Sequence, residues 1–312
     1  MKHARYQGLV TPMVTPLTEQ GDIDRATTVR LMEFLHRFDA NPFVLGTTGE
    51  GSSIAIDQRE VLVKLLVQES PPHLPTMAGV PGLPFADTVR VANRYLELGL
   101  EAVVLTLPNY LLLSAPQMLH YFEELAGQIK GNLILYNIPK TIHMSIPLEV
   151  VETLSHRENV IGIKDSEPGE ARLGQALARW KDRNNFFHFV GTNALMSQGL
   201  QGGSRGIVPS TANLFPQLYQ SMIECCKAGK VAEAREVQQQ TNDLSGVYQQ
   251  GKLLGESLAM LKRLLAIQGL SSPHMAPPLL SESAEAAAQA WEQMRQMLPE
   301  ALTDRETFSV AP

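Results

Sequence analysis

The sequence predicts an α/β fold, namely a TIM (β/α)8 barrel that is followed by a C-terminal helical extension. Short apolar runs rich in β-branched residues alternate with helix-patterned stretches along residues 1–229. Such alternation is typical of βαβ units around a parallel sheet, and eight units close into a barrel. The chain has 312 residues, of which 44% are hydrophobic and 19% charged, so it is long enough for one such barrel with a large core.

The predicted strands are short apolar runs, each bounded by glycine, proline or polar residues that signal a loop. They cover Gly8 to Val14, Phe43 to Gly46, Thr76 to Val80, Ala102 to Leu107, Leu133 to Asn137, Val160 to Lys164, Phe187 to Gly191 and Gly206 to Ser210.

The stretches between these strands have apolar residues at helical spacing. The expected helices lie near Asp24 to Phe38, Asp57 to Gln68, Phe85 to Leu98, Ala115 to Ile129, Pro147 to Ser155, Gly169 to Lys181, Ala194 to Leu200 and Leu214 to Ala228. Ser114 is a candidate cap before Ala115, and Pro147 stands where a first helical residue is expected.

Beyond the barrel, three further helical patterns predict an extension over residues 230–298. They cover Val231 to Tyr248, Leu253 to Gln268 and Ala284 to Leu298. The polar residues 299–312 form a tail, which we expect to be flexible.

Composition excludes several classes of partner. The formal net charge is −6 and no Lys/Arg cluster occurs, which argues against a nucleic acid or an anionic membrane surface. No apolar run reaches the ~18 residues of a membrane span, and no signal peptide is evident, so we expect a cytoplasmic protein. The two cysteines are adjacent and the eight histidines show no metal-site spacing, so neither a disulfide framework nor a metal is predicted.

Lys164 ends an apolar run that reads as a buried strand, Val160 to Lys164. In a TIM barrel the carboxyl ends of the strands carry the chemistry. An amine held among Val and Ile side chains is desolvated, which disfavours the ammonium form and leaves a nucleophile able to form a Schiff base. Alternatively, Lys164 leaves the strand and pairs with Asp165 in a solvated turn.

The second predicted strand ends in Gly46-Thr47-Thr48-Gly49-Glu50. Its glycines allow a tight turn that presents backbone N–H groups, and with two hydroxyls this turn could hold a carboxylate. The alternative is an ordinary glycine-rich turn with capping threonines. A nucleotide-binding P-loop is excluded because the lysine after the second glycine is missing.

Tyr136 stands near the end of the fifth predicted strand, before Pro139. Residues two apart share one face of a strand, so Tyr136 lies with Ile134, and Lys164 with Gly162. Both reactive groups could therefore point into the barrel. A plain core tyrosine is the alternative, but a phenol near a Schiff-base lysine can move protons.

These residues resemble the dihydrodipicolinate synthase and N-acetylneuraminate lyase family of class I aldolases. The resemblance rests on Gly46-Thr47-Thr48-Gly49-Glu50, Tyr136-Asn137-Ile138-Pro139 and Gly162-Ile163-Lys164-Asp165-Ser166, and covers about residues 5–298. It implies a TIM barrel with a helical extension, a lysine Schiff base with pyruvate or another 2-keto acid, an aldehyde as the second substrate, and no cofactor. It also implies a homotetramer, a dimer of dimers, or a homodimer.

The resemblance further implies roles for individual residues. Lys164 is the Schiff-base nucleophile and Tyr136 the proton shuttle, with Thr47 as its relay. Thr48 and the adjacent backbone amides hold the carboxylate of the keto acid.

Tyr110 matches the tyrosine that completes the relay in a neighbouring subunit, although Asn109 replaces the usual second aromatic residue. Val208 matches a position that lines the Schiff-base pocket. Dihydrodipicolinate synthases carry an arginine where this chain has Thr141, preceded by Lys140, and a threonine cannot supply the bidentate fork that grips a carboxylate.

The departures favour aldol cleavage, condensation or dehydration of a 2-keto-3-deoxy sugar acid. Dihydrodipicolinate synthase is the alternative activity, and N-acetylneuraminate lyase is disfavoured by Ile142-His143 and Thr192-Asn193-Ala194. From other classes, a non-catalytic 2-keto acid binding protein stays open, because fold does not fix function. A pyridoxal-phosphate enzyme would need a phosphate-binding cup, which we do not find in the sequence. A doubly wound dehydrogenase would need the Gly-x-Gly-x-x-Gly fingerprint after a strand, which the sequence also lacks.

Overall fold

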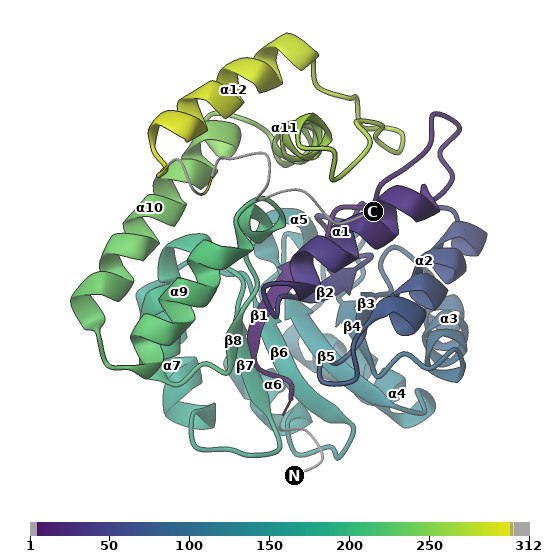
Figure 1. Cartoon of the computed structure of the whole chain (residues 1–312). Coiled ribbons are helices and arrows are strands. Elements are labelled where there is room, and N and C mark those ends of the chain that lie inside the picture. Colours follow the sequence, from purple (N-terminus) through teal and green to yellow (C-terminus); the bar gives the residue numbers. More distant parts are fainter. Residues whose placement is uncertain (1–4, 300–301, 303–312) are drawn as a thin grey trace.

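The structure is a computed structural model that describes residues 5–299 and 302 (Figure 1). The described strands form one closed parallel barrel in the order β1 to β8. They are β1 (Gly8–Pro12), β2 (Asn41–Val44), β3 (Met77–Gly79), β4 (Ala102–Thr106), β5 (Asn132–Asn137), β6 (Val160–Asp165), β7 (Phe187–Val190) and β8 (Gly206–Ile207). This confirms the predicted barrel. Of the predicted tail, residues 300–301 and 303–312 lie outside the described residues.

Helices surround the barrel on its outer side (Figure 1). The helices that follow the strands are α1 (Arg25–His36), α2 (Ile56–Glu69), α3 (Phe85–Glu97), α4 (Ala115–Gln128), α6 (Leu148–Leu154), α7 (Glu170–Trp180), α8 (Met196–Gly202) and α9 (Pro216–Lys227). The extension consists of α10 (Val231–Gln249), α11 (Leu254–Ile267) and α12 (Ala284–Gln296), and α11 and α12 lie at one end of the barrel in Figure 1.

Several boundaries differ from the prediction. Strand β2 ends at Val44 because Leu45 has a left-handed backbone with φ of 57°, which begins a turn before Gly46. Strand β8 ends at Ile207, since a 3₁₀ helix, η2 (Ser210–Asn213), takes up the end of the predicted strand.

Three helical details also differ from the prediction or refine it. A short helix not predicted, α5 (Pro139–Ile142), follows β5, and a 3₁₀ turn, η1 (Asn193–Leu195), precedes α8. Pro147 caps α6 instead of opening it. The predicted cap at Ser114 is confirmed, because the Gln117 side chain accepts a hydrogen bond from the Ser114 N–H at 2.9 Å.

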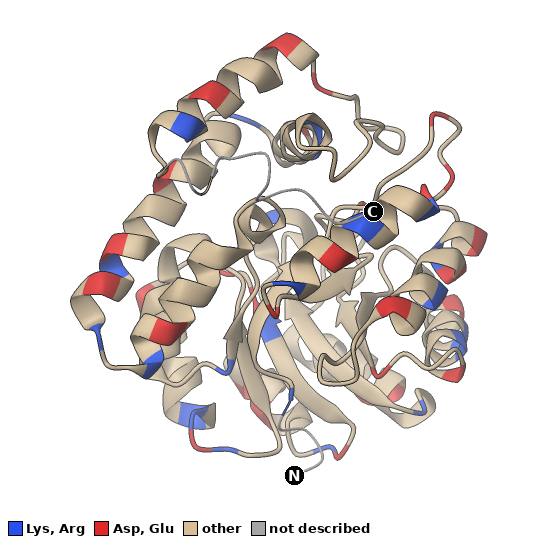
Figure 2. Ribbon diagram, in the orientation of Figure 1, with Lys and Arg blue, Asp and Glu red and all other residues tan. Residues whose placement is uncertain are grey.

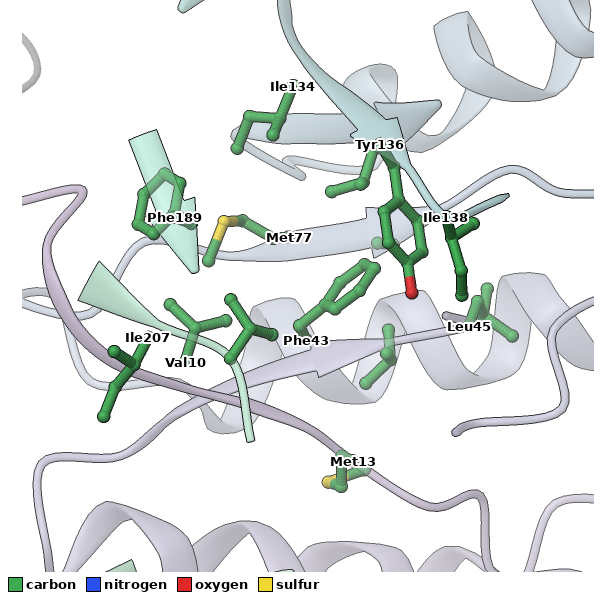
Figure 3. Packing of buried hydrophobic residues seen from close by; sticks show 14 of the residues in the cluster. Val10, Met13, Phe43, Leu45, Met77, Ile134, Tyr136, Ile138, Phe189 and Ile207 are labelled. Atoms are coloured by element: carbon green, nitrogen blue, oxygen red, sulfur yellow. The ribbon is translucent and has the colours of Figure 1, made fainter. Parts of the chain in front are cut away.

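The register of the barrel decides which side chains meet. Strands β5 and β6 align Ile134 with Gly162 and Tyr136 with Lys164. Because alternate residues of a strand point to the same face, Tyr136 and Lys164 enter the barrel side by side near its carboxyl end. The interior below them is apolar, with Val10, Phe43, Met77, Ile134 and Phe189 among its buried side chains (Figure 3).

Charged side chains lie mainly outside the barrel. Figure 2 shows acidic and basic residues interspersed along the outer helices, while the ribbons of the barrel strands are largely without charge. Among the described residues, no helix combines the length and the apolar character needed to span a membrane.

Candidate active site

Lys164 is a buried amine surrounded by aromatic and aliphatic side chains. It is 6% exposed, and its Nζ lies 4.0 Å from the centre of the Tyr136 ring and 5.0 Å from that of Phe43. Val208 lies with Lys164 in the lining of a small apolar cavity inside the barrel. Within the described part of the chain, no carboxylate forms an ion pair with Lys164. The described groups around the amine are therefore rings and aliphatic side chains, and none of them holds it in an ion pair.

The neighbouring Asp165 is held on the opposite face of β6. Its Oδ2 accepts from Nε of Arg172 at 2.7 Å, and its Oδ1 accepts from the Asn137 side-chain amide at 2.9 Å and from the Glu167 N–H at 3.1 Å. The alternative in which Lys164 pairs with Asp165 in a solvated turn is therefore wrong, because strand alternation sends the two side chains in opposite directions.

The two hydroxyls predicted to form the relay, those of Thr47 and Tyr136, lie close to each other. The Thr47 Oγ1 and the Tyr136 Oη are 3.4 Å apart, a distance at the outer limit of a hydrogen bond. Tyr136 is 5% exposed, and Figure 3 shows its hydroxyl directed toward the end of the barrel where Leu45 lies. The phenol therefore lies within reach of the Thr47 hydroxyl, and its ring lies beside the Lys164 amine.

The loop that carries Thr47 is tightly confined by backbone contacts. A Cβ on Gly51 would stand 2.0 Å from the Leu45 carbonyl oxygen, and one on Gly79 would stand 2.4 Å from the same oxygen. The Thr15 hydroxyl also donates to the Gly49 carbonyl at 2.6 Å. These glycines are needed because no side chain fits between the loop, β1 and β3.

A large cavity of about 580 Å³ opens beside this loop, at the carboxyl end of the barrel. The loops after β2, β3, β4 and β5 line it, together with α11 and the turn that follows α11. Many of its lining residues carry hydroxyl groups: Thr47, Ser52, Ser53, Thr88, Thr106, Tyr110, Tyr121, Tyr136 and Thr141. Burial raises the pKa of Tyr121 to about 12, which keeps that phenol a neutral hydrogen-bond donor.

The described lining of this large cavity contains no lysine or arginine. Its one ionisable carboxyl, Glu50, is bound to Lys262 at 2.6 Å. Thr141 lines the cavity, whereas the adjacent Lys140 is exposed and absent from the lining. The cavity therefore presents neutral hydroxyls and apolar surface to a ligand.

Two predicted site residues, Tyr110 and Thr48, are placed differently from Lys164, Tyr136 and Thr47. Tyr110 contributes to the rim of the large cavity, but 94% of its surface is exposed. Thr48 is 8% exposed and belongs to the lining of neither the large cavity nor the small one.

Sequence reasoning missed two residues that matter for the site. Phe43 faces Lys164 across the barrel, and it could have been found because Phe43 and Leu45 share one face of the second strand. Lys262 is buried in α11, and its signal was a lysine inside the apolar stripe that contains Leu258 and Leu265. Within the described residues, no group of three or more His, Cys, Asp or Glu side chains could hold a metal ion.

Comparisons with known proteins agree with this geometry. The sequence model of the dihydrodipicolinate synthetase family matches residues 5–297. The 4-hydroxy-tetrahydrodipicolinate synthase of Alkaliphilus oremlandii is 30% identical over 235 residues, which cover 75% of this chain and 80% of that protein.

Another relative, YagE, has a different assigned activity. The putative 2-dehydro-3-deoxy-D-gluconate aldolase YagE of Escherichia coli K12 is 25% identical over 279 residues, covering 88% of this chain and 91% of YagE. The structure of YagE in complex with pyruvate superposes with a TM-score of 0.87 at 24% identity, covering 94% and 98% of the two chains.

A structure of dihydrodipicolinate synthase from Bacteroides thetaiotaomicron has a TM-score of 0.87 at 27% identity, covering 93% of this chain and 98% of that one. The agreement extends over nearly the whole chain, from β1 through α12. The barrel, its buried lysine and its match to the family model together show that this chain is a lyase of the dihydrodipicolinate synthetase family.

Proposed function

We propose that the protein acts through a Schiff base between Lys164 and pyruvate or another 2-keto acid, without a cofactor. The observation that carries this proposal is a buried amine 4.0 Å from the centre of the Tyr136 ring, whose hydroxyl lies 3.4 Å from that of Thr47, with no carboxylate paired to the amine among the described residues. The pyruvate complex of YagE supports pyruvate as the keto acid.

The reaction begins when the free amine of Lys164 attacks the carbonyl carbon of the keto acid. Tyr136 gives a proton to the carbonyl oxygen and takes one back from the new ammonium nitrogen, with Thr47 as its relay, which leaves a carbinolamine. Tyr136 then protonates the hydroxyl, which departs as water while the lone pair of the nitrogen forms the iminium. The imine draws electrons from C3, so C3 can lose a proton or a carbon–carbon bond to C3 can break. Thr48 with its neighbouring backbone amides holds the carboxylate, and Val208 closes the pocket beside the amine.

The second substrate is a neutral hydroxylated aldehyde, so the favoured reactions are cleavage, condensation or dehydration of a 2-keto-3-deoxy sugar acid. The hydroxyl-rich lining with no lysine or arginine supports this choice, as does the activity named for YagE. Thr141 contributes one of these hydroxyls. Dihydrodipicolinate synthase remains the alternative activity, since several relatives carry that name.

We also propose that the protein is a cytoplasmic homotetramer, a dimer of dimers, or a homodimer. Tyr110, Leu111 and Leu112 are 94%, 66% and 76% exposed and follow one another on the loop after β4. A run of exposed apolar residues of this kind favours an interface between subunits. Tyr110 then completes the proton relay in the neighbouring subunit.

Trapping of the imine tests the mechanism. Borohydride with pyruvate should add one reduced pyruvate unit to Lys164, located by peptide mass spectrometry, and Lys164→Met should remain unmodified. In deuterium oxide, the enzyme should also exchange the methyl protons of pyruvate, which NMR detects without any aldehyde. An unmodified Lys164 would overturn the proposed mechanism, while trapping without exchange would favour a non-catalytic 2-keto acid binding protein.

A substrate panel tests the second half of the proposal. We expect pyruvate release from 2-keto-3-deoxygluconate or a shorter relative to exceed condensation of pyruvate with aspartate semialdehyde. A charge-assisted hydrogen bond contributes about 1.5–3 kcal/mol, so the missing arginine should be costly for the charged aldehyde. Efficient use of aspartate semialdehyde would mean that another cation replaces the arginine.

Subunit exchange tests the role of Tyr110. Mixed oligomers of Lys164→Met and Tyr110→Phe chains should regain activity that neither variant has alone, because some sites then combine an intact lysine with an intact neighbouring tyrosine. No recovery after verified exchange would show that Tyr110 does not act across an interface.

A further inference from the structure

A second buried lysine, Lys262, lies outside the residues that the proposed chemistry uses. Its Nζ donates to Glu50 Oε1 at 2.6 Å, and the side chains of both residues are 1% exposed. The other carboxylate oxygen of Glu50 accepts from the Ala276 N–H at 2.7 Å. Glu50 therefore binds both α11 and the segment after it, and both of its oxygens are occupied.

Glu50 belongs to the same short loop as Thr47. Its own backbone is left-handed, with φ of 55°, and its N–H donates to the Thr47 carbonyl at 3.2 Å. A non-glycine residue in this region is held there by its surroundings. The side-chain contacts of Glu50 thus help to set the backbone that presents Thr47 to Tyr136.

The other end of the link forms part of the cavity wall. Leu254 and Leu258 of α11 and Leu279 after it line the large cavity, and Lys262 lies one helical turn beyond Leu258. The distance between the catalytic loop and this wall is therefore set through the contact between Glu50 and Lys262.

We propose that Lys262 is a positioning residue, which acts through Glu50 to fix the Thr47 loop and the α11 wall against each other. This inference rests on the proposed Schiff-base function and adds a role for the helical extension in it. The pair joins residues 212 positions apart in the chain, so nothing in the local sequence can replace it.

Stability alone is a weak reason for a charged pair at this position. A buried ion pair can often be replaced by apolar side chains of similar volume at little cost, because desolvation offsets most of the attraction between the charges. Burial also lowers the pKa of Lys262, and the nearby Glu50 carboxylate opposes that change. Compared with apolar packing, the ion pair adds directional hydrogen bonds, since each oxygen of the Glu50 carboxylate has one fixed donor.

The test compares two double variants. Glu50→Gln/Lys262→Met removes the charges together and so avoids an unpaired buried ion. Lys252→Met/Glu282→Gln removes the matched pair at 3.4 Å that also joins parts of the extension but does not contact the loop. Both are assayed with pyruvate for imine trapping at Lys164, for methyl-proton exchange at saturating pyruvate, and for thermal midpoint.

We expect the Glu50/Lys262 double variant to fold and to be trapped at Lys164, with proton exchange about 10- to 100-fold slower, since a misplacement of about 1 Å can cost 10²-fold. The Lys252/Glu282 control should exchange at the wild-type rate. Exchange within twofold of wild type in the Glu50/Lys262 variant would overturn the inference. Failure of this variant to fold would also overturn it, because the pair would then serve the fold itself. If wild-type protein is not trapped, the proposed function fails before Lys262 is at issue.

Discussion

Among the described residues, two lysines are buried, and their surroundings are very different. Lys262 belongs to α11, and its side chain faces the loop after β2, where the Glu50 carboxylate is 2.6 Å away. Lys164 lies at the carboxyl end of β6, where two aromatic rings face its amine and no carboxylate pairs with it among the described residues. Lys262 is 1% exposed and Lys164 is 6% exposed, so the degree of burial does not distinguish the two lysines.

The difference lies in what each amine can still do. An ammonium held by a carboxylate is stabilised as a cation, and its lone pair is unavailable for attack on a carbonyl. An amine that faces rings and apolar side chains is free of that competition. Burial therefore marks a lysine as significant, and its partners show whether it holds the structure or performs chemistry.

Replacing each lysine by methionine compares the two sites directly. Lys164→Met should abolish imine trapping and turnover, because the described lining of the two cavities contains no other lysine. The free energy of unfolding, measured by urea denaturation, should stay the same or rise, since a buried amine without a carboxylate partner is removed. A loss of several kcal/mol in stability would show that Lys164 also holds the barrel together.

Tyr136→Phe sharpens the comparison by leaving the amine in place and removing only its proton donor. We expect proton exchange into pyruvate to slow by about 10² to 10⁴, the usual contribution of a positioned acid or base. The fold should be retained, because the ring stays buried and still packs beside the Lys164 amine. Wild-type exchange rates would mean that another group, such as Thr47 with water, supplies the proton.

Lys262→Met should differ from Lys164→Met in lowering the free energy of unfolding. Removing one partner leaves the Glu50 carboxylate buried and unpaired, which costs about 3–5 kcal/mol of unfolding free energy. Urea denaturation measures the loss, and Lys252→Met is the control, because that lysine is only partly buried. A change below about 1 kcal/mol would show that water reaches the Glu50 carboxylate.

His188 extends the comparison to a buried base on the outer face of β7. Burial lowers its pKa to about 4, while Asp165 raises it and Arg172 lowers it further. The unfolded chain takes up this proton first, so the unfolding free energy should fall as pH drops from about 6.5 to about 4. The slope is about 1.4 kcal/mol per pH unit for one group, and His36, whose pKa burial also lowers to about 4, adds to it.

Denaturation at pH 7, 6 and 5 checks this effect. His188→Gln should have a flatter pH dependence than wild type. An unchanged slope in His188→Gln would show that His188 is protonated in the folded protein.

Features that depend on neighbouring residues could be predicted from the chain. The alternation of apolar strands and helices was sufficient for the barrel and its extension, because each βα unit follows its own periodicity. Strand parity was sufficient to place Tyr136 and Lys164 on the inner face. The roles of Thr47 and Tyr110 came from the resemblance to a family, and those roles remain predictions.

Features that depend on residues far apart in the chain needed the folded structure. Phe43 and Lys164 approach each other across the barrel, and Glu50 meets Lys262 over 212 positions, because closure of the sheet and packing of α11 bring them together. The absence of a cation from the described lining of the large cavity also depends on where several loops converge. The local spacing of apolar residues cannot predict such contacts, because they depend on how all the elements pack around the common core.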